Sequence, residues 1–158
     1  MLINIDESLE KQPGSYVIVL TATDKKPLRI GKLGLFALLP GQYFYVGSAH
    51  GPGGIRSRVK HHLKISSKPH WHLDYLRPYC TVSAVWYSYS GDTLEHRWAD
   101  ALAALESLSR PMNGFGSSDC QCPSHLLYTE SPLSFFDPFY EAVLAQNPAS
   151  STIEQITP

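Results

Sequence analysis

Residues suited to phosphate chemistry are concentrated at two tyrosine motifs and in one short basic segment. Tyr16 closes a Gly-Ser-Tyr motif at residues 14–16, and Tyr45 opens a Tyr-Val-Gly motif at residues 45–47. A run of cations and imidazoles follows, made up of Arg56, Arg58, Lys60, His61 and His62. Cations neutralise the charge of a phosphoryl group, while phenols and imidazoles move protons. These residue types therefore predict a site for a phosphodiester.

The distribution of charge along the chain also favours an anionic ligand. No Asp or Glu occurs from Lys25 to Leu73, a segment that holds nine of the thirteen Lys and Arg residues. The whole chain of 158 residues nevertheless has a formal net charge of -1. A protein that coats nucleic acid nonspecifically needs many phosphate contacts, so this balance excludes such a role. Binding to a polyanion must instead be local to the acid-free segment.

Hydrophobic patterns predict the elements that position these residues. β-Branched and aromatic runs predict strands at residues 15–21, 42–47 and 81–89, and weaker apolar runs lie at 28–31 and 35–39. Helical spacing starts near Ile55 and recurs at 94–108 and 135–146, whereas 70–76 is ambiguous between helix and extended chain. We expect an α/β (α+β) domain at residues 1–130, with a small mixed or antiparallel sheet flanked by helices. A C-terminal helix and a flexible tail, frayed from residue 147, would follow at 131–158.

The motifs, in this order, resemble the GIY-YIG nuclease superfamily, and more narrowly its branch catalogued as a domain of unknown function. The resemblance runs from Gly14 to Tyr128. The branch is indicated by GQYFYVGSA at 41–49, HWHLDYL at 70–76 and GFGSSDC at 114–120. The resemblance implies a GIY-YIG-like fold. Because Tyr16 and Tyr45 are farther apart than is usual in that family, it also implies an inserted strand pair or loop between them.

The resemblance further implies roles for particular residues. Tyr16 and Tyr45 correspond to the family tyrosines, Arg58 to the family arginine and His62 to the family histidine. Glu95 corresponds to the acidic metal ligand that opens a later helix. Arg56 is the alternative for the arginine, but Arg58 stands one helical turn before His62, so both side chains can share a face.

These roles predict a mechanism for phosphodiester cleavage. Tyr45, with its phenolate stabilised by Arg58 and a bound cation, or else His62, would activate water. Arg58 would stabilise the pentacoordinate charge, and Tyr16 would hold the phosphate or the water. Glu95, a phosphate and several waters would suffice to bind Mg²⁺ or Mn²⁺. The neighbouring side chains of the basic segment would contact nucleic acid, namely Arg56, Lys60, His61 and Lys64.

A second metal site is suggested by Cys120, Cys122 and His125, which are spaced like part of a zinc site. Asp119, His72 or Cys80 would complete the ligand set. A second close pair of ligands is not apparent, so a buried turn with free thiols is the alternative.

The expected function is therefore a divalent-metal-dependent DNA endonuclease in repair or recombination. The alternatives are a noncatalytic nucleic-acid-binding or adaptor module, working beside a repair glycosylase as the resemblance suggests, and a metal-storing or redox module built on Cys120 and Cys122. No apolar run approaches the ~20 residues needed to cross a bilayer, so we expect no membrane segment. Three cysteines suit a reducing compartment, so a soluble, cytoplasmic protein is expected.

Overall fold

Two neighbouring strands, β1 (Gly14–Ala22) and β4 (Gly41–Ala49), form the centre of the fold and are buried on both faces. They pair antiparallel over their whole length. Side chains alternate between the faces of a strand, so Tyr16 and Ile18 of β1 enter one hydrophobic cluster while Val17 and Val19 enter the other. Burial on both faces explains why these segments are almost continuously apolar and aromatic.

The computed structural model describes residues 8–90, 94–117, 123–130, 136–147 and 153–157. Its central sheet has the order β6-β4-β1-β5-β7, and every neighbouring pair is antiparallel. The outer strands are β5 (Thr81–Tyr89), β6 (Leu126–Thr129) and β7 (Glu154–Ile156). The predicted α+β class is confirmed, and the sheet is antiparallel, not mixed.

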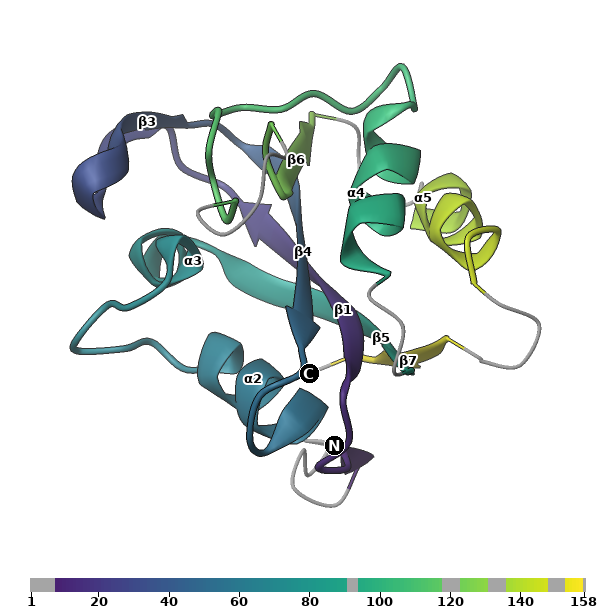
Figure 1. Ribbon diagram of the computed structural model, residues 1–158. Coiled ribbons are helices and arrows are strands. Elements are labelled where there is room, and N and C mark those ends of the chain that lie inside the picture. Colours follow the sequence, from purple (N-terminus) through teal and green to yellow (C-terminus); the bar gives the residue numbers. More distant parts are fainter. Residues whose placement is uncertain (1–7, 91–93, 118–122, 131–135, 148–152, 158) are drawn as a thin grey trace.

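Helices cover both faces of this sheet, as Figure 1 shows. Helices α2 (Gly54–Leu63) and α3 (His72–Leu76) pack on the face that carries the two motif tyrosines. Helices α4 (Glu95–Ala103) and α5 (Phe136–Leu144) pack on the opposite face. The ambiguous segment at 70–76 is thus a short helix, which begins after Trp71.

The expected strand pair between the two tyrosine motifs is a hairpin of β2 (Lys26–Ile30) and β3 (Gly34–Leu38). It forms its own two-stranded sheet. Leu28 and Phe36 lie opposite each other and are buried in the core, whereas the paired Arg29 and Leu35 face outward and are exposed. The hairpin therefore presents an outer surface beside α3.

Two predictions about secondary structure in the second half of the chain are wrong. Helix α4 stops at Ala103 instead of continuing to Leu108, because Ser109 forms a β-bridge with Tyr128 and the chain must turn to reach it. The tail was expected to be frayed, yet β7 pairs with β5 and Ile156 is 4% exposed. The tail carries two isoleucines, Ile153 and Ile156, whose burial stabilises this pairing.

Among the helices that the structure describes, none combines the length and the apolar character that a bilayer-spanning segment requires.

Gly47 must lack a side chain because Tyr16 occupies the space above it. The two residues are opposite each other in the β1–β4 pair, and a Cβ on Gly47 would lie 2.5 Å from Cζ of the Tyr16 ring. The ring is fully buried and cannot move aside without disturbing the core. The glycine of the second tyrosine motif is thus explained by the tyrosine of the first.

We expect Gly47→Ala to lower the free energy of unfolding by about 1–3 kcal/mol, since it overpacks this contact. Gly51→Ala is the matched control, because a Cβ there meets nothing within 4 Å. The control should change stability by no more than about 0.5 kcal/mol. Urea unfolding of both variants measures the difference, and equal stabilities would contradict this account of Gly47.

Candidate functional site

One pocket brings together five of the candidate residues from the sequence, namely Tyr16, Tyr45, Arg58, Glu95 and His125. We call it the tyrosine pocket; it has a volume of about 150 Å³ and is partly open to solvent. Its lining residues are Tyr16, Tyr45, Val46, Gly47, Ser48, Arg58, Trp71, Glu95, His96, Gly116 and His125. Both motif tyrosines, the arginine and the acidic residue therefore meet at a single site, as the sequence predicted.

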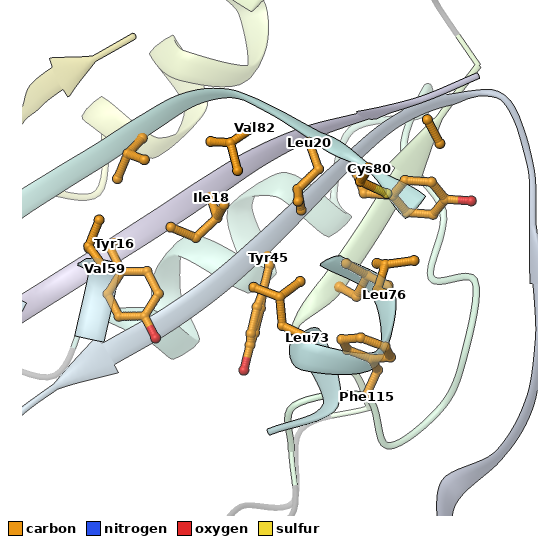
Figure 2. Packing of buried hydrophobic residues seen from close by; sticks show 14 of the residues in the cluster. Tyr16, Ile18, Leu20, Tyr45, Val59, Leu73, Leu76, Cys80, Val82 and Phe115 are labelled. Atoms are coloured by element: carbon orange, nitrogen blue, oxygen red, sulfur yellow. The ribbon is translucent and has the colours of Figure 1, made fainter. Parts of the chain in front are cut away.

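Each of the four side chains comes from a different, regular element. Tyr16 lies on β1, Tyr45 on β4, Arg58 on α2, and Glu95 is the first residue of α4. Figure 2 shows the phenol oxygens of the two tyrosines pointing the same way, away from the aliphatic core. Side chains that project from packed strands and helices are held more precisely than side chains on loops.

His62 lies behind the tyrosines and does not line the tyrosine pocket. It is 1% exposed, and its Nε2 lies 2.9 Å from the hydroxyl oxygen of Tyr16. Its ring also packs edge-on against Tyr45, with centroids 5.5 Å apart. Nδ1 has no hydrogen-bond partner among the described residues. We therefore assign the ring proton to Nε2, since the other tautomer would strand a buried N–H.

Burial keeps all three of these side chains neutral near pH 7. It raises the pKa of Tyr16 well above its usual value, and nearby Tyr45 adds to that rise while Arg58 offsets part of it. Burial likewise raises the pKa of Tyr45, and the Glu95 carboxylate adds to this effect. Burial lowers the pKa of His62 to about 3. Unliganded, the pocket thus opposes the phenolate that the sequence-based mechanism assigned to Tyr45.

Arg58 is held in the pocket by Trp71. The guanidinium carbon lies 4.3 Å from the centre of the indole ring, a cation–π contact. The indole also packs edge-on against His61, with ring centroids 4.6 Å apart. Trp71 itself is only partly buried and lines the site.

The segment that carries Trp71 is fixed by Asp74. The Asp74 side chain is 2% exposed and accepts hydrogen bonds from the backbone N–H groups of His70 and Trp71, at 2.8 and 3.0 Å. Nε2 of His61 lies 2.9 Å from the same carboxylate. Asp74 thereby caps the start of α3 and ties it to α2.

Two histidines flank Glu95. His125 is 2% exposed, and its Nδ1 donates to the carbonyl oxygen of Val46 at 3.1 Å while lying 3.6 Å from the Glu95 carboxylate. Nε2 of His96 lies 3.8 Å from the other carboxylate oxygen. His96 was missed on sequence grounds, although its position next to the predicted ligand was a usable signal.

The Gly114–Gly116 loop closes the pocket over Tyr45. Gly116 has a positive φ of 72°, and a Cβ there would lie 3.2 Å from both the Tyr45 hydroxyl and the Cβ of His125. Its N–H donates to Nδ1 of His72 at 2.8 Å. Only glycine satisfies both the backbone conformation and the available space.

The residues expected to contact nucleic acid do not gather in the tyrosine pocket. Nε of Arg56 donates to the carbonyl of Leu9 at 2.6 Å, which removes Arg56 as the alternative to Arg58 at this site. His61 pairs with Asp74, as described above. Lys60 is half-buried and Lys64 is exposed, and neither lines this pocket.

The described residues offer few metal ligands near one another. Within the described parts of the chain, no group of three or more His, Cys, Asp or Glu side chains could hold a metal ion. Cys120, Cys122 and Asp119 of the expected zinc site lie outside the described residues. Of the other suggested ligands, His72 accepts from Gly116 and Cys80 packs among Leu20 and Leu76 in the core (Figure 2).

We expect Asp74→Asn to cost about 1–3 kcal/mol of stability near pH 6, because charge-assisted hydrogen bonds are lost. Burial alone would raise the pKa of Asp74, but hydrogen bonds from His70, His61 and Trp71 outweigh it and lower the pKa. The stabilisation is therefore fully present above the usual carboxyl pKa near 4 and is lost as pH falls through the lower folded value.

Urea unfolding of both proteins between pH 2 and 6 measures this effect. The difference in the free energy of unfolding between wild type and variant should become smaller as the pH falls below about 4. A difference that stays constant over this range would contradict the proposed hydrogen bonding of Asp74.

Comparison with known proteins identifies the family to which the chain belongs. No curated protein and no solved structure matches the chain. The sequence model of the family described as "Domain of unknown function DUF123" matches residues 15–146, which include every residue of the tyrosine pocket. The chain therefore belongs to the DUF123 family.

Proposed function

We propose that this protein is a divalent-metal-dependent DNA endonuclease of the GIY-YIG type that acts in DNA repair or recombination, in the cytoplasm. One observation carries the proposal: two phenols, a guanidinium and a carboxylate from four separate elements meet in one solvent-open pocket. Each group has a use in phosphodiester cleavage. The acid-free segment next to the pocket supplies the positive potential that attracts a polyanion.

Glu95 fits the part of a metal ligand. Its side chain is 19% exposed in the pocket, and among the described residues its carboxylate lies within 4 Å of the ring nitrogens of His96 and His125. Mg²⁺ and Mn²⁺ prefer oxygen, and Mg²⁺ keeps several waters, so one carboxylate completed by substrate and water is an adequate set. A cation bound there would act as a Lewis acid on the phosphoryl group and would counter the Glu95 charge that raises the Tyr45 pKa.

The other pocket residues bind the phosphate and its developing charge. With the ring proton of His62 directed to Tyr16, the hydroxyl proton of Tyr16 is available to a phosphate oxygen. Arg58, oriented by Trp71, neutralises charge on the phosphoryl oxygens. Tyr45 is the candidate base, and in its neutral form it is a further donor to the phosphate. His62 is then a positioning residue and not the base, because it does not line the pocket and its pKa is about 3.

A noncatalytic nucleic-acid-binding or adaptor module is the second candidate, beside a repair glycosylase as partner. The specific observation in its favour is that burial favours the neutral form of both tyrosines and that, among the described residues, only Glu95 lines the pocket with a carboxylate. Such a site binds phosphate without activating water. The experiment below separates the two candidates.

We expect wild-type protein to nick branched, nicked or abasic DNA when Mg²⁺ or Mn²⁺ is present. Glu95→Gln, Tyr45→Phe and Arg58→Ala should each reduce the nicking rate by about 10²–10³-fold, since each removes a group that stabilises the transition state. Glu95→Gln and Tyr45→Phe should still bind the same DNA in a filter or anisotropy assay.

Arg56→Ala is the matched control, because Arg56 lies on the same helix two residues away but points to Leu9. Per folded molecule it should keep the wild-type rate within about threefold, a change of less than 1 kcal/mol. If wild type binds these DNAs but nicks none of them with either metal, the adaptor is correct. If the Arg56 and Arg58 variants lose equal activity, the assigned site is wrong.

The pH dependence of nicking gives a separate prediction. The His62 pKa of about 3 keeps the imidazole neutral from pH 5 to 9. The curve of nicking rate against pH should therefore have the same shape in wild type and in His62→Gln over this range. An inflection near pH 6–7 that is present in wild type and absent in the variant would restore His62 as the base.

A further inference from the structure

A second pocket lies beside the tyrosine pocket, between the β2–β3 hairpin and α3. We call it the hairpin pocket; its volume is about 370 Å³. Lys26 and Arg29 line it from β2, and Tyr75 and Tyr79 line it from α3 and the 3₁₀ turn that follows. The hairpin pocket is thus a concave site that the proposed nuclease chemistry does not use.

The cations of the hairpin pocket are available to an anion. Lys26 and Arg29 are both exposed, and the described residues offer neither of them an acidic partner. Lys26 instead lies over the Tyr79 ring, with Nζ 4.3 Å from the ring centre. Both cations belong to the segment without Asp or Glu, so the pocket attracts negative charge.

Aromatic and proline side chains make up much of the remaining lining. Tyr79 is 39% exposed and Tyr75 is half-buried. Three exposed prolines, Pro27, Pro69 and Pro78, also line the pocket. An open groove that combines cations with exposed aromatic rings is how proteins bind single-stranded nucleic acid, since bases stack on the rings and phosphates pair with the cations.

Asp74 also lines the hairpin pocket, but its charge is turned inward. The side chain is 2% exposed, and its oxygens accept from two backbone N–H groups and contact His61. Its carboxylate therefore opposes an incoming phosphate less than an exposed acid would.

The two pockets are separated by a single turn of helix. Trp71, the N-cap of α3, lines the tyrosine pocket, and Tyr75, four residues later, lines the hairpin pocket. Four residues of helix rise only about 6 Å. A strand that leaves the tyrosine pocket past Trp71 therefore reaches Tyr75 and Tyr79 directly.

We propose that the hairpin pocket binds unpaired nucleotides of DNA that flank the scissile phosphate. Stacking on Tyr79 requires bases that are not paired, so the preferred substrate carries a single-stranded flank next to the cut. This substrate class rests on the proposed endonuclease function, whereas the binding of single strands to this pocket does not require cleavage.

The test measures binding of a fluorescent oligothymidylate of about ten nucleotides, a length within the usual range of single-strand sites, by anisotropy in EDTA. Tyr79→Ala and Arg29→Ala should each weaken binding by roughly tenfold, the effect expected for one stacked base or one phosphate contact. Tyr79→Phe should keep wild-type affinity, because the ring remains. Lys32→Ala is the matched control, since Lys32 is an exposed cation of the same hairpin that does not line the pocket.

Salt and duplex controls sharpen the result. Arg29→Ala should reduce the slope of log affinity against log salt by about 0.7, and Tyr79→Ala should leave it unchanged. Neither Tyr79 variant should alter affinity for a blunt duplex. The assignment is overturned if wild type does not bind the oligonucleotide, if Tyr79→Ala binds it normally or weakens duplex binding equally, or if an acidic peptide displaces it as effectively.

The outcome is independent of the nuclease assay. If wild type nicks nothing but shows this pattern of binding, the hairpin pocket stands and the endonuclease proposal fails. If wild type nicks flapped DNA, Tyr79→Ala should raise KM for that substrate by roughly tenfold with kcat unchanged, because Tyr79 lies outside the tyrosine pocket.

Discussion

In the antiparallel pair of β1 and β4, Tyr16 lies opposite Gly47 and Ile18 lies opposite Tyr45. This register puts both phenols on one face of the sheet, and the missing side chain at Gly47 leaves room for the Tyr16 ring. A slip of one residue would turn one strand's tyrosine to the opposite face, among Trp86 and Trp98. The site therefore depends first on strand register, and the core residues that enforce register also position the phenols.

Burial then determines the protonation states in the site. Tyr16, Tyr45 and His62 pack against one another with little exposure, so each is held in its neutral form. The neutral groups serve as hydrogen-bond donors and acceptors. The permanent positive charge comes from Arg58, and the negative charge comes from Glu95, which is 19% exposed. The site thus separates a dry, neutral layer from a wetter, charged layer, which the proposed function assigns to the phosphodiester.

Aromatic and imidazole contacts connect this layer to the rest of the molecule. Asp74 fixes the start of α3, and Trp71 at that start stacks on Arg58. The same helix presents Tyr75, four residues later, to the hairpin pocket. The segment at 70–76, whose sequence is ambiguous between helix and extended chain, therefore contributes lining residues to both pockets.

Local patterns determined the strands at the two tyrosine motifs, the helix that carries Arg58, the strand pair between them and the α+β class. These features follow from side-chain periodicity and turn residues, which act over a few neighbouring positions. The sequence also identified Tyr16, Tyr45, Arg58 and Glu95 through the resemblance. It did not show that Trp71 lines a pocket, that Arg56 turns to Leu9, or that β7 completes the sheet. Those outcomes, and the neutral state of the phenols, were decided by tertiary structure, because burial and long-range partners depend on which distant segments pack together.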